Sequence, residues 1–256
     1  MKTLLITNQK GGVGKTTISI HLALQAVSMG LKTLYIDFDG QCNSSDFFRT
    51  YLANHPQKFK NVKALSIVDL FSSDEFNHDL TDSDFTIVYS VKYLGDIELN
   101  LDSWVKNFNH VKQFFYICII DTPPSVGIPQ IAPMITTDYV LSPIELNAYS
   151  INGSADLITT IANVRDNYNQ NLKFLGLLPN RVNKNNNHQL ALLNQLAQNY
   201  GDFLYRDNLM IPERQALSET AYVNLPVWEI KEHSARKVAS KVRPIFANII
   251  QQTMEI

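Results

Sequence analysis

The stretch Lys10-Gly11-Gly12-Val13-Gly14-Lys15-Thr16-Thr17 decides the fold of this 256-residue chain. An apolar run, residues 3–7, precedes it and indicates a buried strand. Apolar residues follow at spacings of three or four, as on one helix face: Ile18, Leu22, Ala26 and Met29. Glycines allow backbone dihedrals and a close approach that a Cβ would block. The pattern therefore predicts a strand, a phosphate-binding loop and a helix, in that order.

The residue types in the loop fit nucleotide phosphates. Backbone N–H groups at the start of a helix point at an anion and carry a positive partial charge. Lys15 is expected to neutralise phosphate oxygens, and the Thr16 hydroxyl to join a Mg²⁺ shell. Gln9 stands at the position of the first glycine in the usual pattern, so the loop is a variant of it. The predicted phosphate-binding residues are Gly11, Gly12, Val13, Gly14, Lys15, Thr16 and Thr17.

Three aspartates follow predicted strands. Asp37 and Asp39 come at the end of the apolar run 33–36, and Asp121 ends the run 116–120. The second run is almost continuously apolar, which is typical of a central parallel strand covered on both faces. Carboxylates beside a lysine-threonine phosphate loop are what Mg²⁺-assisted phosphoryl transfer needs, because the metal requires ligands and the attacking water must be oriented.

Strands alternating with helices predict an α/β fold: a doubly wound, mostly parallel sheet flanked by helices, the P-loop NTPase fold. Ligands then bind at the carboxyl ends of the strands, where the loop and the aspartates lie. We expect one P-loop ATPase domain over residues 1–256. Residues 87–101 are interpreted as a pair of strands and residues 65–71 as a helical piece. Further strands are expected at 139–141 and 174–178, and further helices at 155–164, 190–200 and 235–251.

The composition excludes several classes of protein. A formal net charge of −2 argues against a histone-like polycation, although a local basic patch remains compatible with it. Cys42 and Cys118 form no Cys-x-x-Cys pair, which argues against an iron–sulfur or zinc site. The N-terminal residues run straight into the loop, so we expect no signal peptide, and no apolar stretch reaches the ~20 residues of a spanning helix. The expected compartment is the cytoplasm.

These motifs resemble those of the ParA/MinD family of ATPases. The spelling of residues 10–17 is similar to its deviant Walker A motif, residues 34–41 resemble its second motif, and residues 119–124 its Walker B region. The resemblance implies ATP and Mg²⁺ as ligands and a dimer in which Lys10 reaches the partner subunit's nucleotide. It also implies that Asp39 positions the attacking water.

The same resemblance assigns the metal and the switch loop. It implies that Asp37 and Asp121, together with Thr16, belong to the magnesium shell. Gly40 stands where the family usually has proline, which predicts a more mobile loop after Asp39.

Adenine recognition is implied at two further places. Residues 177–182 are like the family's strand end whose asparagine contacts the base, which points to Asn180. Residues 211–219 resemble the element that closes the base pocket, with Pro212 packing on the adenine. Glu213 occupies the common arginine position and Arg214 follows it, so the arginine's role does not carry over directly.

The remaining sequence favours the DNA-partitioning branch of the family. Residues 231–243 hold five basic side chains against one acidic one, and sequence-independent DNA binding needs little more than such cations repeated by a dimer. The predicted DNA contacts are Arg214, Lys231, Arg236, Lys237, Lys241 and Arg243. The short ParA type binds DNA as an ATP dimer on the nucleoid, and a ParB-type partner at the centromere stimulates its slow hydrolysis. Because the loop comes so early, we expect no N-terminal helix-turn-helix domain.

Three alternatives stay open at this point. A MinD-like ATPase would use a C-terminal amphipathic helix on a membrane, but the apolar stripe of residues 245–254 lacks flanking cations after Arg243, so we interpret it as a core face. A ParA-like ATPase that positions a protein cargo would have nearly the same biochemistry. A metabolic P-loop enzyme would have no use for Lys10. The sequence does not indicate the cargo, the partner or a role for residues 54–83.

Overall fold

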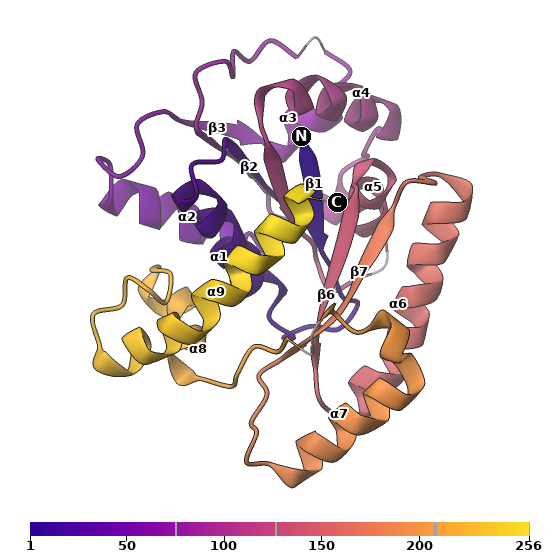
Figure 1. Ribbon diagram of the computed structural model, residues 1–256. Helices are drawn as coiled ribbons and strands as arrows, with labels where there is room; N and C mark the ends of the chain where they lie inside the picture. Colours follow the sequence, from indigo (N-terminus) through magenta and orange to yellow (C-terminus); the bar gives the residue numbers. More distant parts are fainter. Residues whose placement is uncertain (75, 126, 207–208, 256) are drawn as a thin grey trace.

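The computed structural model describes residues 1–74, 76–125, 127–206 and 209–255, with residues 148–152 as backbone alone. These residues form one seven-stranded sheet in which every pair of neighbours is parallel, in the order β3-β4-β2-β5-β1-β6-β7 (Figure 1). The strands are β1 (Lys2–Ile6), β2 (Thr33–Asp37), β3 (Val62–Ser66), β4 (Phe85–Tyr89), β5 (Ile117–Asp121), β6 (Tyr139–Glu145) and β7 (Lys173–Asn180). The predicted α/β fold with a doubly wound parallel sheet is confirmed.

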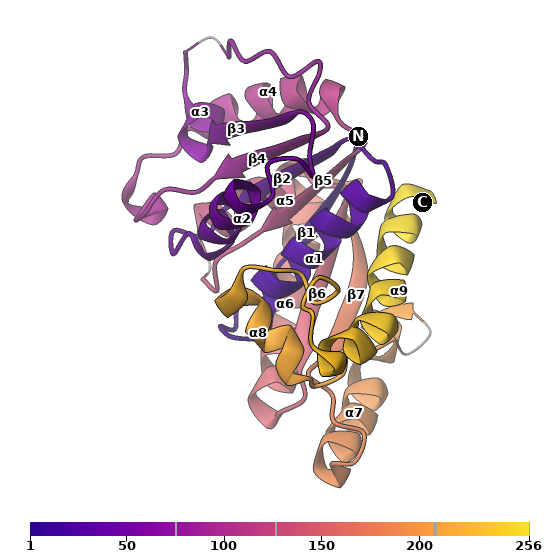
Figure 2. The same cartoon turned by 90° about the vertical axis from the view of Figure 1, so that its left-hand side faces the viewer.

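Helices cover both faces of this sheet (Figure 2). The α-helices are α1 (Lys15–Ser28), α2 (Asn43–Asn54), α3 (Ile67–Phe71), α4 (Leu101–Val111), α5 (Ile128–Thr136), α6 (Ala148–Asn167), α7 (Asn187–Tyr200), α8 (Gln215–Val223) and α9 (His233–Glu255). Short 3-10 turns are η1 (Leu94–Asp96), η2 (Lys112–Phe114) and η3 (Gly201–Phe203). Alternate residues of β1 face opposite cores: Leu4 and Ile6 pack with α1, α2, α8 and α9, whereas Leu5 packs with α3 to α6. A smaller cluster joins α7 to β7.

The order of the strands places the site. β1 lies between β5 and β6 in the sheet. The connection after β1 leads to β2 on one side of it, whereas the connection after β5 leads to β6 on the other side, so a crevice opens at the carboxyl end of β1. Asp37 and Asp121 are partners in the register of β2 and β5, and Ile6 is the partner of Asp121 on β1. The aspartates and the glycine loop therefore meet at one edge of the sheet.

The C-terminal helix is part of the core. Phe246, Ile249 and Ile250 are fully buried, and α9 packs on α1. This confirms the interpretation of the apolar stripe as a core face. No helix in the described ranges is both long and apolar enough to cross a membrane.

The prediction of two strands over residues 87–101 is wrong. Only β4 forms there; η1 follows it, Tyr93 turns the chain with a φ of 61°, and Leu94 is buried. Asn100 then caps α4 through a hydrogen bond from Ser103 N, 3.0 Å long. The helical piece predicted from residue 65 begins at Ile67, because Leu65 still belongs to β3.

Candidate functional site

The glycine loop connects β1 to α1 and has the backbone that glycine is needed for. Gly12 and Gly14 have φ values of 77° and 96°, and a Cβ at Gly14 would clash with the side-chain amide of Asn180. Gly14 precedes the first residue of α1, and its carbonyl accepts a 3.0 Å hydrogen bond from Ile18 N. The predicted strand, loop and helix are thus present, with the helix N-terminus opening at the loop.

Lys15 is the first residue of α1, where the loop ends. Its side chain is buried, and Nζ donates to the carbonyl oxygen of Lys10 at 3.0 Å. Burial lowers the pKa of Lys15, whereas the charges of Asp121 and Asp39 act in the opposite direction. The ammonium is therefore held close to both predicted carboxylates, at the point where phosphate oxygens would be neutralised.

Asp121 has the unusual environment in this site. It is fully buried at the end of β5, and neither side-chain oxygen accepts a hydrogen bond of ordinary geometry. Burial is the main cause that raises its pKa well above the usual range, and the charge of Asp37 adds to it, whereas Thr16 and Lys15 act the other way. A buried carboxylate that accepts no hydrogen bond costs free energy. This arrangement therefore fits the binding of a cation together with a ligand.

A magnesium ion fits these residues. The Thr16 hydroxyl and the Asp121 carboxylate are oxygen ligands of the kind Mg²⁺ prefers, and Mg²⁺ usually takes only one or two protein ligands beside phosphate and water. Accordingly, the described ranges contain no group of three or more His, Cys, Asp or Glu residues arranged to hold a metal alone.

Asp37 orders the neighbouring helix. One of its oxygens accepts hydrogen bonds from Ser45 N at 2.9 Å and Ser45 Oγ at 2.6 Å, and the other accepts one from Asp39 N at 2.9 Å. Because Ser45 is the third residue of α2, Asp37 caps this helix from the end of β2. Burial is the main cause that raises the pKa of Asp37, and these hydrogen bonds oppose it. A contribution to the metal shell stays a prediction.

Asp39 lies in the loop between β2 and α2. It is 8% exposed, and its Oδ1 accepts a hydrogen bond from Gln41 N at 3.0 Å. A Cβ added at Gly40 would lie only 3.1 Å from Leu94 N and 3.4 Å from Tyr93 N. Gly40 is therefore packed closely against the chain after β4, which gives the absence of proline there a steric reason.

Lys10 contacts its own chain. Its Nζ donates to Asn147 Oδ1 at 2.9 Å, and its backbone N donates to Asn8 Oδ1 at 2.8 Å. Asn8 is in turn fixed by hydrogen bonds from its amide to Ser142 Oγ and Pro143 O on β6. The action of Lys10 in a partner subunit stays a prediction. Asn147 was not predicted, because its proximity to Lys10 depends on the pairing of β1 with β6.

A cavity of about 780 Å³ opens beside the loop. Gly14, Thr17, Asn180 and Pro212 all line it. Asn180 donates to the carbonyl oxygen of Val13 at 2.7 Å, so it also holds the phosphate loop. The structure thus brings both predicted adenine residues to one cavity of a size usual for nucleotides.

Backbone pairing brings Pro212 to this wall. Val182 bridges to Pro212, and hydrogen bonds run from Val182 N to Ile211 O (3.0 Å) and from Ile211 N to Pro179 O (2.9 Å). The ion pair between Arg181 and Glu145, 2.7 Å long, also lines the cavity and was missed by the sequence analysis.

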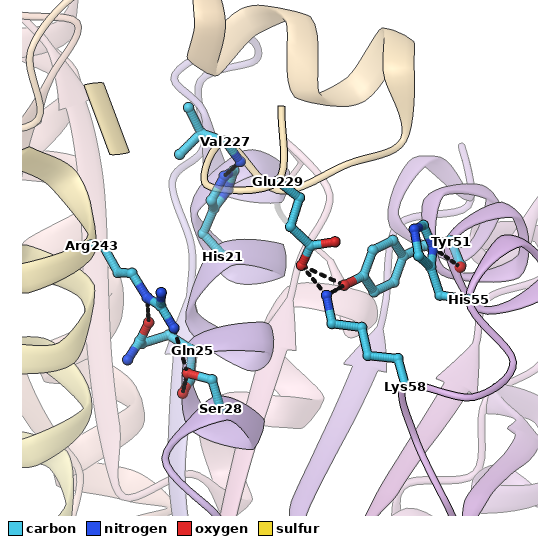
Figure 3. A network of polar contacts seen from close by, with 9 residues as sticks. All are labelled: His21, Gln25, Ser28, Tyr51, His55, Lys58, Val227, Glu229 and Arg243. Carbon is cyan, nitrogen blue, oxygen red and sulfur yellow. Dashed lines mark hydrogen bonds and ion pairs between the residues drawn. The ribbon is translucent and has the colours of Figure 1, made fainter. Parts of the chain in front are cut away.

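All six predicted DNA contacts are exposed around α8 and α9. Three of them line one groove of about 470 Å³ between these helices: Arg214, Lys237 and Lys241. Lys231 and Arg236 are also exposed. Arg243 is exposed too, but it also contacts the rest of the molecule. Its Nε donates to Gln25 Oε1 at 2.9 Å (Figure 3), and its guanidinium lies 5.2 Å from the Trp228 ring. The structure therefore separates Arg243 from the groove cations.

Comparison with known proteins identifies the family. A family model described as an AAA domain matches residues 1–174. The IncC protein of Escherichia coli is 36% identical over 272 residues, covering 100% of this chain and 71% of its own. The sporulation initiation inhibitor protein Soj of Bacillus subtilis (strain 168) is 26% identical over 235 residues, covering 88% and 90%.

Solved structures share the fold. A cobyrinic acid a,c-diamide synthase from Mycobacterium smegmatis with bound ADP and magnesium has a TM-score of 0.70 at 20% identity, over 99% of this chain and 96% of that one. A putative plasmid partition protein from Borrelia burgdorferi B31 bound to AMPPNP has a TM-score of 0.69 at 21% identity, over 97% and 98%. The fold alone thus serves more than one function, and the sequence relatives decide between them. This chain belongs to the ParA/MinD family of partitioning ATPases.

Proposed function

We propose that this protein is a partition ATPase that dimerises with ATP, binds DNA without sequence specificity and hydrolyses ATP slowly until a ParB-type partner stimulates it. The names of its relatives support the partitioning role, since the relatives include a chromosome-partitioning ATPase Soj of Treponema pallidum and a chromosome partitioning protein ParA of Caulobacter vibrioides. The cargo would be a plasmid or a chromosome, and the protein would work on the nucleoid in the cytoplasm.

One observation carries the ATPase part of this proposal: the buried Asp121 without a hydrogen-bond partner beside the buried Lys15. A bound Mg²⁺ would offset the negative charge of the phosphate oxygens. In this proposal Thr16 and Asp121 hold the metal, directly or through water, and Asp37 keeps the neighbouring loop in place. Lys15 and the loop N–H groups bind the phosphates.

Asp39 is the proposed catalytic residue. Its position at the end of β2, with one oxygen bound to Gln41 N, leaves the carboxylate near Lys15 and hence near the γ-phosphate. From there it orients the attacking water in line with the leaving group. Asn180 and Pro212 would bind the adenine in the cavity.

Dimerisation is proposed to use Lys10. For its ammonium to reach the partner subunit's nucleotide, Lys10 must leave Asn147. An ATP-dependent rearrangement is thus built into the proposal: the γ-phosphate charge offers a stronger partner than the amide oxygen. DNA binding is assigned to the cations around α8 and α9, doubled by the dimer axis. A membrane role has less support, because the apolar stripe of α9 is buried in the core.

Light scattering tests the dimer. We expect the wild-type protein to double its mass with ATP and Mg²⁺ but not with ADP, and Lys10→Ala to remain a monomer while still binding ATP. Lys60→Ala, which changes an exposed lysine in the loop after α2, is the matched control and should dimerise normally. An ATP-dependent dimer of undiminished affinity in Lys10→Ala would exclude the proposed role of this lysine.

A further inference from the structure

Residues 226–230 lie between α8 and α9, and we call them the bridge segment. They contact both helices that begin at the ATP site (Figure 3). Val227 N donates to Nε2 of His21 on α1 at 3.1 Å. The carboxylate of Glu229 accepts a hydrogen bond from the hydroxyl of Tyr51 on α2 at 2.8 Å. Two hydrogen bonds between segments far apart in the sequence thus attach the bridge segment to the helices of the ATP site.

α2 connects the position of Asp37 to the bridge segment. Ser45, the third residue of this helix, donates to Asp37 through both its N–H and its hydroxyl. Tyr51 follows about 9 Å further along the helix axis. It is 1% exposed, and its ring stacks on that of Phe47 with centroids 5.6 Å apart. Because the ring is fixed to the helix, a movement of α2 at its N-terminus also moves the Tyr51 hydroxyl.

The contact between α2 and the bridge segment joins three side chains. Lys58 Nζ donates to the Tyr51 hydroxyl at 2.7 Å and also pairs with the Glu229 oxygen to which Tyr51 donates. Burial, and then the hydrogen bond to Glu229, raise the pKa of Tyr51, so the hydroxyl keeps its proton and remains a donor. The side chains of Glu229 and Lys58 are 20% and 42% exposed. The contact can therefore break and form again without opening the core.

At its ends, the bridge segment determines how α8 and α9 are spaced. The groove lined by Arg214, Lys237 and Lys241 lies between these two helices. α9 is fixed on α1, where Arg243 donates to Gln25. A displacement of the bridge segment therefore moves α8 relative to α9, and it changes the distances between the cations on the two sides of the groove.

We propose that Tyr51 and Glu229 are positioning residues that couple the ATP site to the groove between α8 and α9. When nucleotide binding displaces Asp37, α2 moves the bridge segment through these two side chains, and the cations of the groove take the spacing that fits DNA phosphates. Such coupling is reciprocal, so bound DNA raises the affinity for ATP by the same factor. This inference rests on the proposed ATP-dependent DNA binding and names the residues that transmit it.

The test measures the affinity of the full chain for a labelled random-sequence duplex, with ADP and with ATP, by fluorescence anisotropy. The variants are Tyr51→Phe, which keeps the buried ring, and Glu229→Gln. Tyr139→Phe is the matched control for the first, because Tyr139 is also a buried tyrosine whose hydroxyl contacts a lysine. Glu232→Gln is the control for the second, because it removes the same charge from a residue that lines the groove and whose carboxylate accepts from Ser234.

We expect the ratio of the DNA affinity with ATP to that with ADP to fall about threefold or more in Tyr51→Phe and in Glu229→Gln, with both controls like the wild type. The double variant should fall no further than either single one, because both changes remove the same contact. The gain in ATP affinity on adding DNA should shrink by the same factor. A wild-type ratio in Tyr51→Phe, or an equal fall in Glu232→Gln, would overturn the proposal. Loss of the ATP-dependent dimer in Tyr51→Phe would overturn it in favour of a role in folding or dimerisation.

Hydrogen exchange separates this inference from the proposed function. On adding ATP, the amides of the bridge segment should change their exchange rates in the wild type and in Tyr139→Phe, but not in Tyr51→Phe. Unchanged rates in the wild type, or equal changes in Tyr51→Phe, would overturn the proposal. If the wild type binds DNA equally with ADP and ATP, the proposed function fails, while the exchange rates still decide whether α2 moves the bridge segment.

Discussion

His21 offers a prediction whose size can be worked out. It lies on α1, and both of its ring nitrogens are used: Nδ1 lies 2.6 Å from Thr17 O, and Nε2 lies 3.1 Å from Val227 N (Figure 3). Because Val227 N must donate, Nε2 must accept, so the ring is neutral with its proton on Nδ1. The ring is fully buried between Trp228 and Phe246, with centroids 5.1 and 5.3 Å away.

Burial lowers the pKa of His21 from 6.5 to about 4. Between these values the unfolded chain binds a proton that the folded chain does not, so acidification favours unfolding. The contribution of His21 to stability is fully present above pH 6.5 and is lost as the pH falls towards 4. The loss amounts to about 2 kcal/mol at pH 5 and about 3 kcal/mol below pH 4.

The assay is urea unfolding at pH 7.5 and pH 5 for the wild type and for His21→Gln, which cannot titrate. We expect the wild type to lose about 2 kcal/mol more than the variant between the two pH values. His188→Gln, a change to an exposed histidine on α7, should keep the full loss. An equal loss of stability in His21→Gln and the wild type would refute the reasoning, because all other titrating groups are shared.

Three further predictions concern the site. Asp39→Ala should bind ATP and dimerise but lose turnover, which a phosphate-release assay checks; turnover at the parental rate would exclude its catalytic role. Asp121→Asn should raise the free energy of unfolding without nucleotide by about 1–3 kcal/mol, since it replaces a buried carboxylate that accepts no hydrogen bond of ordinary geometry by a neutral amide. Thermal melts should show a smaller gain on adding ATP and Mg²⁺; a less stable variant without nucleotide would contradict this. Lys241→Ala should lower the slope of DNA affinity against salt concentration, both on logarithmic scales, by about one unit per subunit. Arg243→Ala should lower this slope less, because the Arg243 side chain is held by Gln25. A salt titration measures both slopes, and the reverse order would contradict the assignment.

The phosphate loop and its carboxylates were predictable because their signals are local. Apolar runs that end in Asp37 and Asp121 indicate strand ends, and in a parallel sheet these ends meet at one edge. The glycine spacing before Lys15 adds a helix N-terminus at the same edge. No tertiary information is needed for this part of the fold.

The missed elements lack such local signals. The N-cap position of α2 is Cys42, which makes no side-chain cap, because Asp37 caps the helix from another strand. α5 contains Pro133 within the helix, which hides its period. The turn at Tyr93 depends on the packing of Gly40, and sequence pattern alone gives no sign of it.

The basic run shows the same limit. Counting charges cannot separate Arg243 from Lys241, although one packs on Trp228 and the other lines the groove. The difference arises from the contact of α9 with α1, which joins residues more than two hundred positions apart.

The central claim, an ATP switch that controls DNA binding, is tested most directly by binding to a random-sequence duplex with ADP and with ATP over a range of salt. The account predicts tight binding with ATP alone, with an affinity that falls steeply as salt rises. Equal binding with ADP and ATP, or no binding while the ATP-dependent dimer still forms, would contradict it.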